Sequence, residues 1–322
     1  MSHVASTADG AAPPRHKAGR RRSKPARAVT EGTRAERRLG WLLCAPAALV
    51  MLVVAGWPII YSVLLSFQRY DLRFPDARGW IGLDNYATVL ANRYWWTSFG
   101  VTTVIMVISV AIELVLGMAL AMVMHRTLAA RGLLRTVVLI PYGIVTVVAA
   151  YGWKYAWTPG TGWLARFLSN DSAPLTHQIP SLAIIILAEV WKTTPFMALL
   201  LLAGLALVPD ELHRAAEMDG ANRWQRFVKV TLPLMKPAIV VALLFRALDA
   251  FRIYDNIYIL TNGAQSTGSV SIQTYHNLIG GLNLGIGSTL SVLIFLSVAI
   301  LAFIFIKIFG AAAPGSEPEE TR

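Results

Sequence analysis

Residues 208–233 read VPDELHRAAEMDGANRWQRFVKVTLP, a charged stretch that lies between two long apolar segments. Pro209 suits the first position of a helix, and Asp210 and Glu211 suit the positive end of its dipole. Gly220 can adopt the left-handed conformation that ends a helix. The first half of the stretch is therefore predicted to form a short helix that ends at this glycine.

The second half of the same stretch is predicted to form an amphipathic helix. Asn222 and Gln225 have the spacing of a capping box, in which each side chain bonds the backbone amide of the other residue. An apolar face then lies opposite a basic face, made of Trp224, Phe227 and Val228 against Arg223, Arg226 and Lys229. Such a helix fits the membrane surface and a protein-docking groove equally well.

Six apolar segments flank or precede this stretch, at about 41–67, 98–124, 133–157, 181–207, 234–260 and 286–309. Each is long enough to cross a bilayer as a helix, which takes about 20 residues, and far longer than a barrel strand of about 10. Backbone groups in lipid have no water to bond, so each segment must be helical. The fold class is predicted to be an all-α membrane protein with six transmembrane helices.

The net charge of +11 is concentrated before the first apolar segment, because ten of the 29 Lys and Arg residues lie within 15–38. Basic residues beside a span favour the cytoplasmic side, so we expect a plasma-membrane protein with both termini inside the cell. Nucleic-acid or anionic-lipid recognition by this segment is the less favoured interpretation, and no nucleic-acid partner is expected. The first span is too long for a signal peptide. The single Cys44 allows neither an internal disulfide nor a cysteine metal site.

Three regions follow from this pattern. Residues 1–38 are predicted to be a disordered basic cytoplasmic tail, since they hold too little apolar surface to fold. Residues 39–310 form the transmembrane domain, with the charged stretch 208–233 on the cytoplasmic side. Residues 311–322 form a short cytoplasmic C-terminal tail.

The charged stretch resembles the signature loop of binding-protein-dependent ABC importer permeases, whose pattern is Glu-Ala-Ala, three residues, Gly, nine residues, Ile-any-Leu-Pro. The matching positions are Ala215, Ala216, Gly220, Val230, Leu232 and Pro233. Arg214 departs from the pattern, because it stands where the family usually has glutamate. The resemblance extends over most of the chain, including 190–196 and 202–205, and is that of the carbohydrate-uptake branch. Residues 251–256 and 261–263 are similar to permeases of trehalose importers.

This resemblance implies a type I ABC importer permease fold and inward transport of a disaccharide, trehalose, by alternating access. It implies a second homologous permease, a dimer of ATPase subunits, an extracytoplasmic sugar-binding lipoprotein and membrane lipids as partners. ATP and Mg²⁺ would bind the ATPase, because this chain has no phosphate-binding loop and is not expected to be an enzyme. The coupling contacts with the ATPase are assigned to Glu211, Arg214, Ala215, Ala216, Glu217, Asp219, Gly220, Trp224 and Phe227.

A substrate pathway is predicted beside Pro195, which lacks an amide and so frees a backbone carbonyl within the fourth span. Hydroxyl partners and aromatic faces suit a sugar, and the candidate pathway residues are Trp191, Lys192, Thr193, Thr194, Asp249, Arg252, Tyr254 and Asn256. The fifth span contains the charged residues Arg246, Asp249, Arg252 and Asp255. Pairing of these side chains with one another is as plausible as contact with the substrate. For Glu113, Glu189 and Lys192, a buried pairing that fixes helix register is the simpler explanation.

Three other functions fit parts of the sequence. The same machinery could import another neutral sugar or a polyol phosphate. A secondary transporter could use Glu113 and Asp249 to carry protons or sodium, and would work without an ATPase. A membrane sensor could use the basic tail and the charged stretch to bind signalling partners without net transport.

Overall fold

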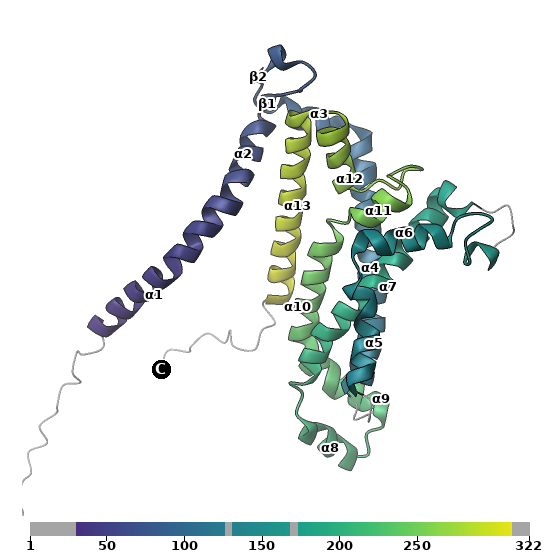
Figure 1. Cartoon of the computed structure of the whole chain (residues 1–322). Coiled ribbons are helices and arrows are strands. Elements are labelled where there is room, and N and C mark those ends of the chain that lie inside the picture. The colour runs from purple at the N-terminus through teal and green to yellow at the C-terminus, as the bar shows by residue number, and fades with distance from the viewer. Residues whose placement is uncertain (1–29, 126–130, 168–172, 311–322) are drawn as a thin grey trace, which may run out of the picture. The chain divides into compact units, whose positions relative to one another are not determined.

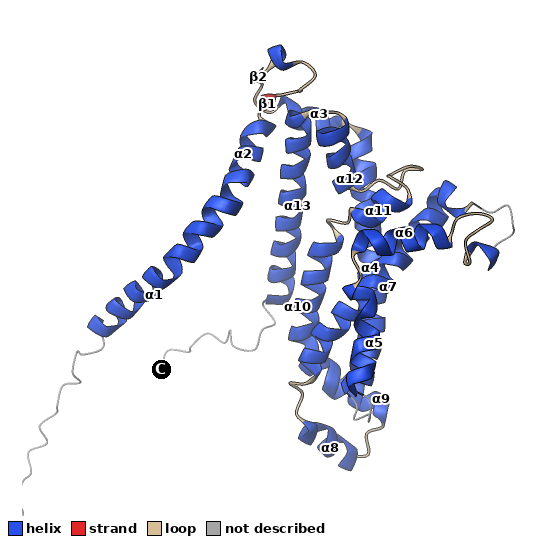
Figure 2. Cartoon of the chain, in the orientation of Figure 1, coloured by secondary structure: helices blue, strands red, loops and turns tan. Residues whose placement is uncertain are grey.

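The computed structural model describes residues 30–125, 131–167 and 173–310, and its regular structure is almost entirely helical (Figures 1 and 2). One short antiparallel ladder pairs β1 (Gln68–Arg69) with β2 (Gly79–Trp80). The predicted all-α fold class is confirmed. Most of the predicted N-terminal tail, residues 1–29, and the C-terminal tail, residues 311–322, lie outside the described residues.

The chain forms two compact units, and the first comprises Met1–Trp57. Its described part is α1 (Thr30–Met51) followed by a turn of π-helix at Leu52–Gly56. Residues 30–38 are therefore helical, whereas the sequence predicted a disordered tail up to residue 38. The reason is local, because this segment contains Ala, Glu and Arg, which are good helix formers and extend the apolar helix backwards.

The second unit comprises Pro58–Arg322 and holds the remaining elements. In chain order these are α2 (Trp57–Ser66, whose first residue belongs to the first unit), β1, a 3₁₀ turn at Pro75–Ala77, β2, α3 (Asp84–Ala91), α4 (Arg93–His125), α5 (Arg131–Gly143), α6 (Thr146–Ala156), 3₁₀ turns at Ala165–Phe167 and Pro174–Thr176, α7 (Gln178–Leu205), α8 (Asp210–Met218), α9 (Arg223–Arg226), a π turn at Phe227–Thr231, α10 (Leu232–Ala250), α11 (Asp255–Leu260), α12 (Val270–Tyr275), a π turn at His276–Gly280 and α13 (Leu284–Gly310).

The core of this unit lies between α4, α7 and α10, which pack on one another (Figure 1). Small residues let the helix backbones approach closely, as is common between transmembrane helices. A methyl group added at Gly204 of α7 would lie 2.3 Å from the Cβ atom of Ala238 on α10. One added at Gly117 of α4 would lie 2.8 Å from Met197 Cγ on α7.

Within the described residues, five helices are long and apolar enough to cross a membrane: Arg38–Ser66, Arg93–His125, Gln178–Leu205, Arg223–Ala250 and Leu284–Ile308. The predicted segments 41–67, 98–124, 181–207 and 286–309 agree with four of them to within a few residues. The predicted span 133–157 is instead a bent pair, Arg135–Gly143 and Thr146–Ala156, with 90° between its two helices. Pro141 and Gly143 lie just before the bend, and both residue types weaken a helix.

The fifth predicted span, 234–260, also differs, because α10 ends at Ala250 and α11 begins only at Asp255. The charged residues at 246, 249, 252 and 255 therefore do not share one helix. Asp255 is the first residue of α11, where the helix dipole favours a carboxylate. By contrast, α7 runs through Pro195 without the interruption that the sequence suggested.

Candidate functional site

A cluster of buried polar side chains joins the three core helices. Arg246 of α10 donates through Nε to Glu113 Oε2 at 2.6 Å and through Nη2 to Glu113 Oε1 at 2.9 Å. It therefore binds this carboxylate of α4 in a bidentate manner. Nη2 also donates to Thr193 Oγ1 at 3.0 Å and to Glu189 Oε1 at 3.4 Å, both on α7. Such two-pronged contacts between arginine and a carboxylate are strong and fix geometry.

Burial makes this cluster important for the fold. Arg246 and Glu113 are both 0% exposed, and Glu189 is 7% exposed. Two buried carboxylates therefore share one buried guanidinium, and Asp249 adds a further contact to it from a side chain that is 62% exposed. Because a charge in lipid is costly unless it is paired, Arg246 holds α4, α7 and α10 in one register.

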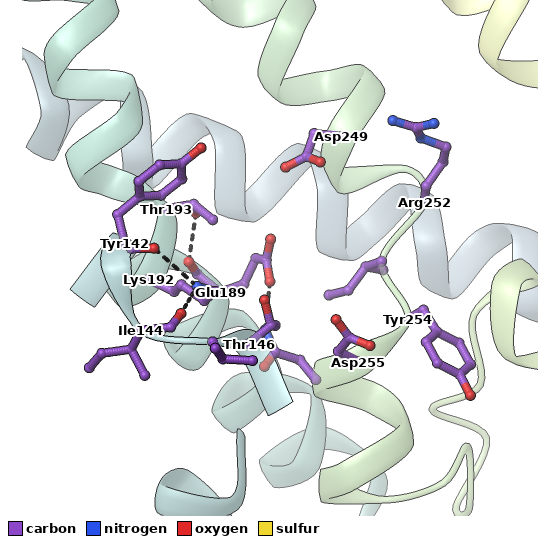
Figure 3. A pocket seen from close by; sticks show the side chains of 13 residues that line it. Tyr142, Ile144, Thr146, Glu189, Lys192, Thr193, Asp249, Arg252, Tyr254 and Asp255 are labelled. Atoms are coloured by element: carbon purple, nitrogen blue, oxygen red, sulfur yellow. Dashed lines mark hydrogen bonds between the residues drawn. The ribbon is translucent and has the colours of Figure 1, made fainter. Parts of the chain in front are cut away.

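A cavity of about 570 Å³ opens beside this cluster (Figure 3). Its wall is formed by the bend between α5 and α6, by α7 and by the segment that joins α10 to α11. The lining residues are Tyr142, Ile144, Val145, Thr146, Glu189, Lys192, Thr193, Asp249, Arg252, Ile253, Tyr254, Asp255 and Asn256. Asp249 and Arg252 lie across the cavity from Tyr142 and Lys192 in Figure 3. The wall is thus rich in hydrogen-bonding groups of both kinds, donors and acceptors.

Two of the cavity residues connect it to the buried cluster. Asn256 donates through Nδ2 to Glu189 Oε2 at 2.6 Å, while the other oxygen of this carboxylate faces Arg246. The hydroxyl of Thr193 lies 2.8 Å from Glu113 Oε1 and 2.6 Å from the backbone oxygen of Glu189. A movement of Asn256 in the cavity wall would therefore shift the carboxylate of Glu189 and change its contact with Arg246.

Six of the eight residues predicted for the substrate pathway line this cavity: Lys192, Thr193, Asp249, Arg252, Tyr254 and Asn256. The other two do not. Trp191 packs edge-on against Trp153 at 6.0 Å between ring centroids and lines a separate apolar cavity of about 820 Å³. Thr194 is buried and donates to the backbone oxygen of Val190 at 2.6 Å.

The sequence did not indicate the contribution of the α5–α6 bend, which supplies Tyr142, Ile144, Val145 and Thr146 to the cavity. A proline and a glycine separated by one residue inside a predicted span were the available signal. Asp255 also lines the cavity, although it was not among the eight predicted pathway residues.

The predicted pairing of Lys192 with the glutamates is wrong. The ammonium group of Lys192 donates to the backbone oxygens of Ile144 at 2.7 Å and Tyr142 at 3.4 Å. The cation that pairs with Glu113 and Glu189 is Arg246. The two candidate cations lie on different helices, so only the packing of α10 against α4 and α7 selects between them.

The charged stretch contains the glycine-terminated helix and the capping box that its sequence predicted, but its second helix, α9, comprises only Arg223–Arg226 and continues through the π turn into α10. Asn222 accepts from the backbone amide of Gln225 at 2.8 Å, and its own amide donates to Gln225 Oε1 at 2.9 Å, which completes the capping box. Gly220 has a φ of +81°. Its amide donates to Glu217 O at 3.0 Å, and that of Ala221 to Ala216 O at 2.9 Å, the two bonds of a glycine-terminated helix end. Pro209 caps α8 rather than forming its first turn.

Most residues predicted to contact the ATPase lie on the surface of this loop. Glu211, Arg214, Ala215, Glu217, Asp219 and Gly220 are exposed, and Ala216 and Phe227 are half-buried. Trp224 is 70% exposed and Met218 is 88% exposed. Arg226 and Glu217 tie α9 to α8 through a 2.7 Å ion pair. A loop that presents large apolar side chains beside charges has the character of a docking surface.

The parts of the chain that the structure describes contain no group of three or more His, Cys, Asp or Glu residues that could hold a metal ion. The site consists of a polar cavity among the membrane helices. The loop that holds α8 lies at one end of α7 and α10 (Figure 1). This combination defines an integral membrane transport subunit.

Comparison with known proteins identifies the kind of transport subunit. Residues 86–313 match the family described as binding-protein-dependent transport system inner membrane component, and the chain belongs to this family. It is similar to the trehalose transport system permease protein SugA of Mycobacterium tuberculosis, with 66% identity over 284 residues, 88% of this chain and 92% of that protein. It is also similar to the trehalose/maltose transport system permease protein MalF of Thermococcus litoralis, with 38% identity over 281 residues, 85% of this chain and 94% of that protein.

Solved structures show the same fold. A bacterial alginate ABC transporter, in complex with a periplasmic protein that binds an alginate pentasaccharide, contains a chain that is 20% identical. The TM-score is 0.73, over 86% of this chain and 96% of that one. The chain thus has the type I ABC importer permease fold, and it is a transport subunit rather than an enzyme.

Proposed function

We propose that this chain translocates trehalose inward across the plasma membrane, as one permease subunit of an ABC importer. The observation that carries the proposal is the 66% identity to SugA over nearly the whole of both chains. Transport would proceed by alternating access, in which the helices rock to open the cavity to one side of the membrane and then to the other.

The cavity has the chemistry that a neutral disaccharide requires. A volume of about 570 Å³ lies within the range of roughly 300–1,000 Å³ typical of small-ligand sites. Asp249 and Asp255 can accept hydrogen bonds from sugar hydroxyls, and Arg252 can donate to them. Tyr254 offers an aromatic face for the apolar side of a sugar ring. We therefore assign the sugar contacts to these residues together with Asn256.

The exposed loop 208–233 is proposed to couple this chain to a dimer of ATPase subunits, which bind ATP and Mg²⁺ and supply the energy. The exposed side chains of Trp224 and Met218 would enter a groove on the ATPase, as anchors of a docking surface. Arg214 is exposed on the same loop and suits an acidic group of the partner. The remaining predicted contacts lie on the same loop.

Two further partners are proposed, a homologous second permease that completes the translocation path and an extracytoplasmic sugar-binding lipoprotein that delivers the sugar. The periplasmic binding protein in the alginate transporter complex supports the second of these. The basic residues before the first span favour a cytoplasmic N-terminus. The C-terminus and the coupling loop would then lie on the same side of the membrane.

Uptake of radiolabelled trehalose by cells that lack this chain tests the proposal. Wild type should restore uptake, and Gly220→Pro should not, because proline cannot adopt a φ of +81° or donate the amide bond to Glu217. Gly160→Pro is the matched control, since Gly160 also has a positive φ, +76°, but lies outside the coupling loop. It should restore uptake at equal membrane levels.

Each result of this experiment has a distinct meaning. If deletion of the chain leaves trehalose uptake intact, the substrate assignment is wrong, and competition with other sugars would identify the cargo. If Gly220→Pro transports as wild type does, the loop does not couple the chain to an ATPase.

A further inference from the structure

The bend between α5 and α6 exposes backbone groups that a continuous span would satisfy. α5 ends at Gly143, α6 begins at Thr146, and their axes differ by 90°. The last carbonyl groups of a helix have no partner within the helix. In a membrane, where water is scarce, such groups need a donor from elsewhere in the protein.

Lys192 supplies this donor from α7. Its ammonium group lies 2.7 Å from the carbonyl oxygen of Ile144, the residue that follows α5, and 3.4 Å from that of Tyr142, in the last turn of α5. A positive charge at the carboxyl end of a helix is also favoured by the helix dipole. The side chain is 8% exposed, and its ammonium group also lies over the ring of Tyr142, 5.9 Å from the centroid.

The same short stretch of α7 holds both arms of the bend. Phe196 stacks on Tyr142 of α5, with 5.4 Å between ring centroids and 14° between ring planes. Trp191 packs edge-on against Trp153 of α6 at 6.0 Å. Lys192 lies between these two aromatic contacts in sequence. The arm α5 packs on α7, while the arm α6 also packs on α11, so the bend joins two helices with different neighbours.

The bend also forms part of the cavity wall, through residues 142 and 144–146 (Figure 3). We propose that Lys192 is a positioning residue, which holds the α5–α6 bend in the conformation that shapes the sugar cavity, rather than a residue that binds the sugar. The proposal rests on the proposed function for its transport readout. Its structural readout does not depend on the identity of the sugar.

The test compares Lys192→Met, Lys192→Gln and Lys192→Arg in the complete transporter, reconstituted with its partner subunits in lipid vesicles. Spin labels on cysteines at Val137 of α5 and Tyr151 of α6, both exposed, report the bend angle as a distance distribution in a Cys44→Ser background. Lys154→Met is the matched control, because it removes a lysine of α6, one arm of the bend, and leaves Lys192 of α7 in place.

Without sugar, Lys192→Met should shift or broaden the distance distribution, and Lys154→Met should leave it unchanged. If the bend then adopts the cavity-forming conformation only about a tenth of the time, KM for trehalose should rise about tenfold at an unchanged maximal rate. Lys192→Arg should restore both values, because guanidinium can donate to the same carbonyls. Lys192→Gln, which keeps a neutral donor, should give a distance distribution and a KM between those of the wild type and Lys192→Met. If Lys192→Met does not accumulate in the membrane, Lys192→Gln provides the test.

Two results would overturn the proposal. If KM rises in Lys192→Met while the sugar-free distance stays sharp and unchanged, Lys192 contacts the sugar directly. If the distance changes and KM does not, the bend does not shape the sugar site. A transporter that moves no trehalose even as wild type would refute the proposed substrate, yet the sugar-free distances would still decide whether Lys192 holds the bend.

Discussion

Replacing Arg246 with leucine should destabilise this protein far more than replacing an exposed arginine. Arg246 is 0% exposed and pairs with Glu113, which is also 0% exposed, through bonds of 2.6 and 2.9 Å. Leucine would fill part of the volume but would leave two carboxylates, those of Glu113 and Glu189, without their cation. An uncompensated buried charge is among the few single changes that remove most of the stability of a domain.

The expected loss is about 3–5 kcal/mol, the range measured when one partner of a buried ion pair is removed. A typical domain has only about 5–15 kcal/mol in total, so this loss is a large share of the stability. The other members of the cluster should matter less. Asp249→Asn should cost at most about 1 kcal/mol, because its carboxylate is 62% exposed and already hydrated.

Thermal unfolding of the purified chain in detergent micelles, together with its level in membranes, measures this loss. Arg252→Leu is the matched control, since it removes an exposed arginine from the same region and should change stability by no more than about 0.5 kcal/mol. The double variant Glu113→Leu with Arg246→Leu should recover part of the loss, because well-packed apolar residues then replace one buried ion pair, while Glu189 still lacks its cation. If Arg246→Leu were as stable as Arg252→Leu, the proposed role of the cluster would be refuted.

Three further predictions concern other parts of the chain. Gly204→Ala should cost about 1–3 kcal/mol, because its methyl group would lie 2.3 Å from Ala238 Cβ and push α7 away from α10; thermal unfolding measures this. Trp224→Ala should abolish ATP-driven uptake and ATPase binding in pull-down assays while thermal stability is retained, since this ring is 70% exposed. Arg73 lowers the pKa of Asp71 from 3.8 to about 2 through a side-chain hydrogen bond, so wild-type stability relative to Asp71→Asn should fall as pH decreases from about 4 to about 2.

Each of these predictions has its own control. Gly100 of α4 has open space around it, so Gly100→Ala should be neutral or slightly stabilising; equal losses at Gly100 and Gly204 would exclude helix crowding as the cause. Trp80→Ala removes a similarly exposed ring outside the coupling loop and should leave uptake intact. For Asp71, stability is expected to fall with decreasing pH because its pKa is lower in the folded state than in the unfolded state. The ionised carboxylate is therefore the form that stabilises the fold. Parallel pH profiles of the wild type and Asp71→Asn would contradict it.

The sequence by itself determined the class of fold, four of the spans, and the helix end and capping box of the loop 208–233. These features depend on residues that are close along the chain. Length and hydropathy decide whether a segment can cross a bilayer. Gly220 ends α8, and the side chains of Asn222 and Gln225 close the capping box within three residues. The resemblance that suggested the family rests on the same local pattern.

The tertiary structure alone decided how the charged residues pair and where the cavity lies. Arg246 meets Glu113, a residue 133 positions away, and Lys192 meets a carbonyl 48 positions away at a bend that the hydropathy pattern did not show. Glu113, Glu189, Lys192 and Arg246 all occupy apolar segments, so each needed a partner, but their spacing along the chain does not say which one. The packing of α4, α7 and α10 makes that choice, because only charges brought within hydrogen-bonding distance compensate one another in lipid.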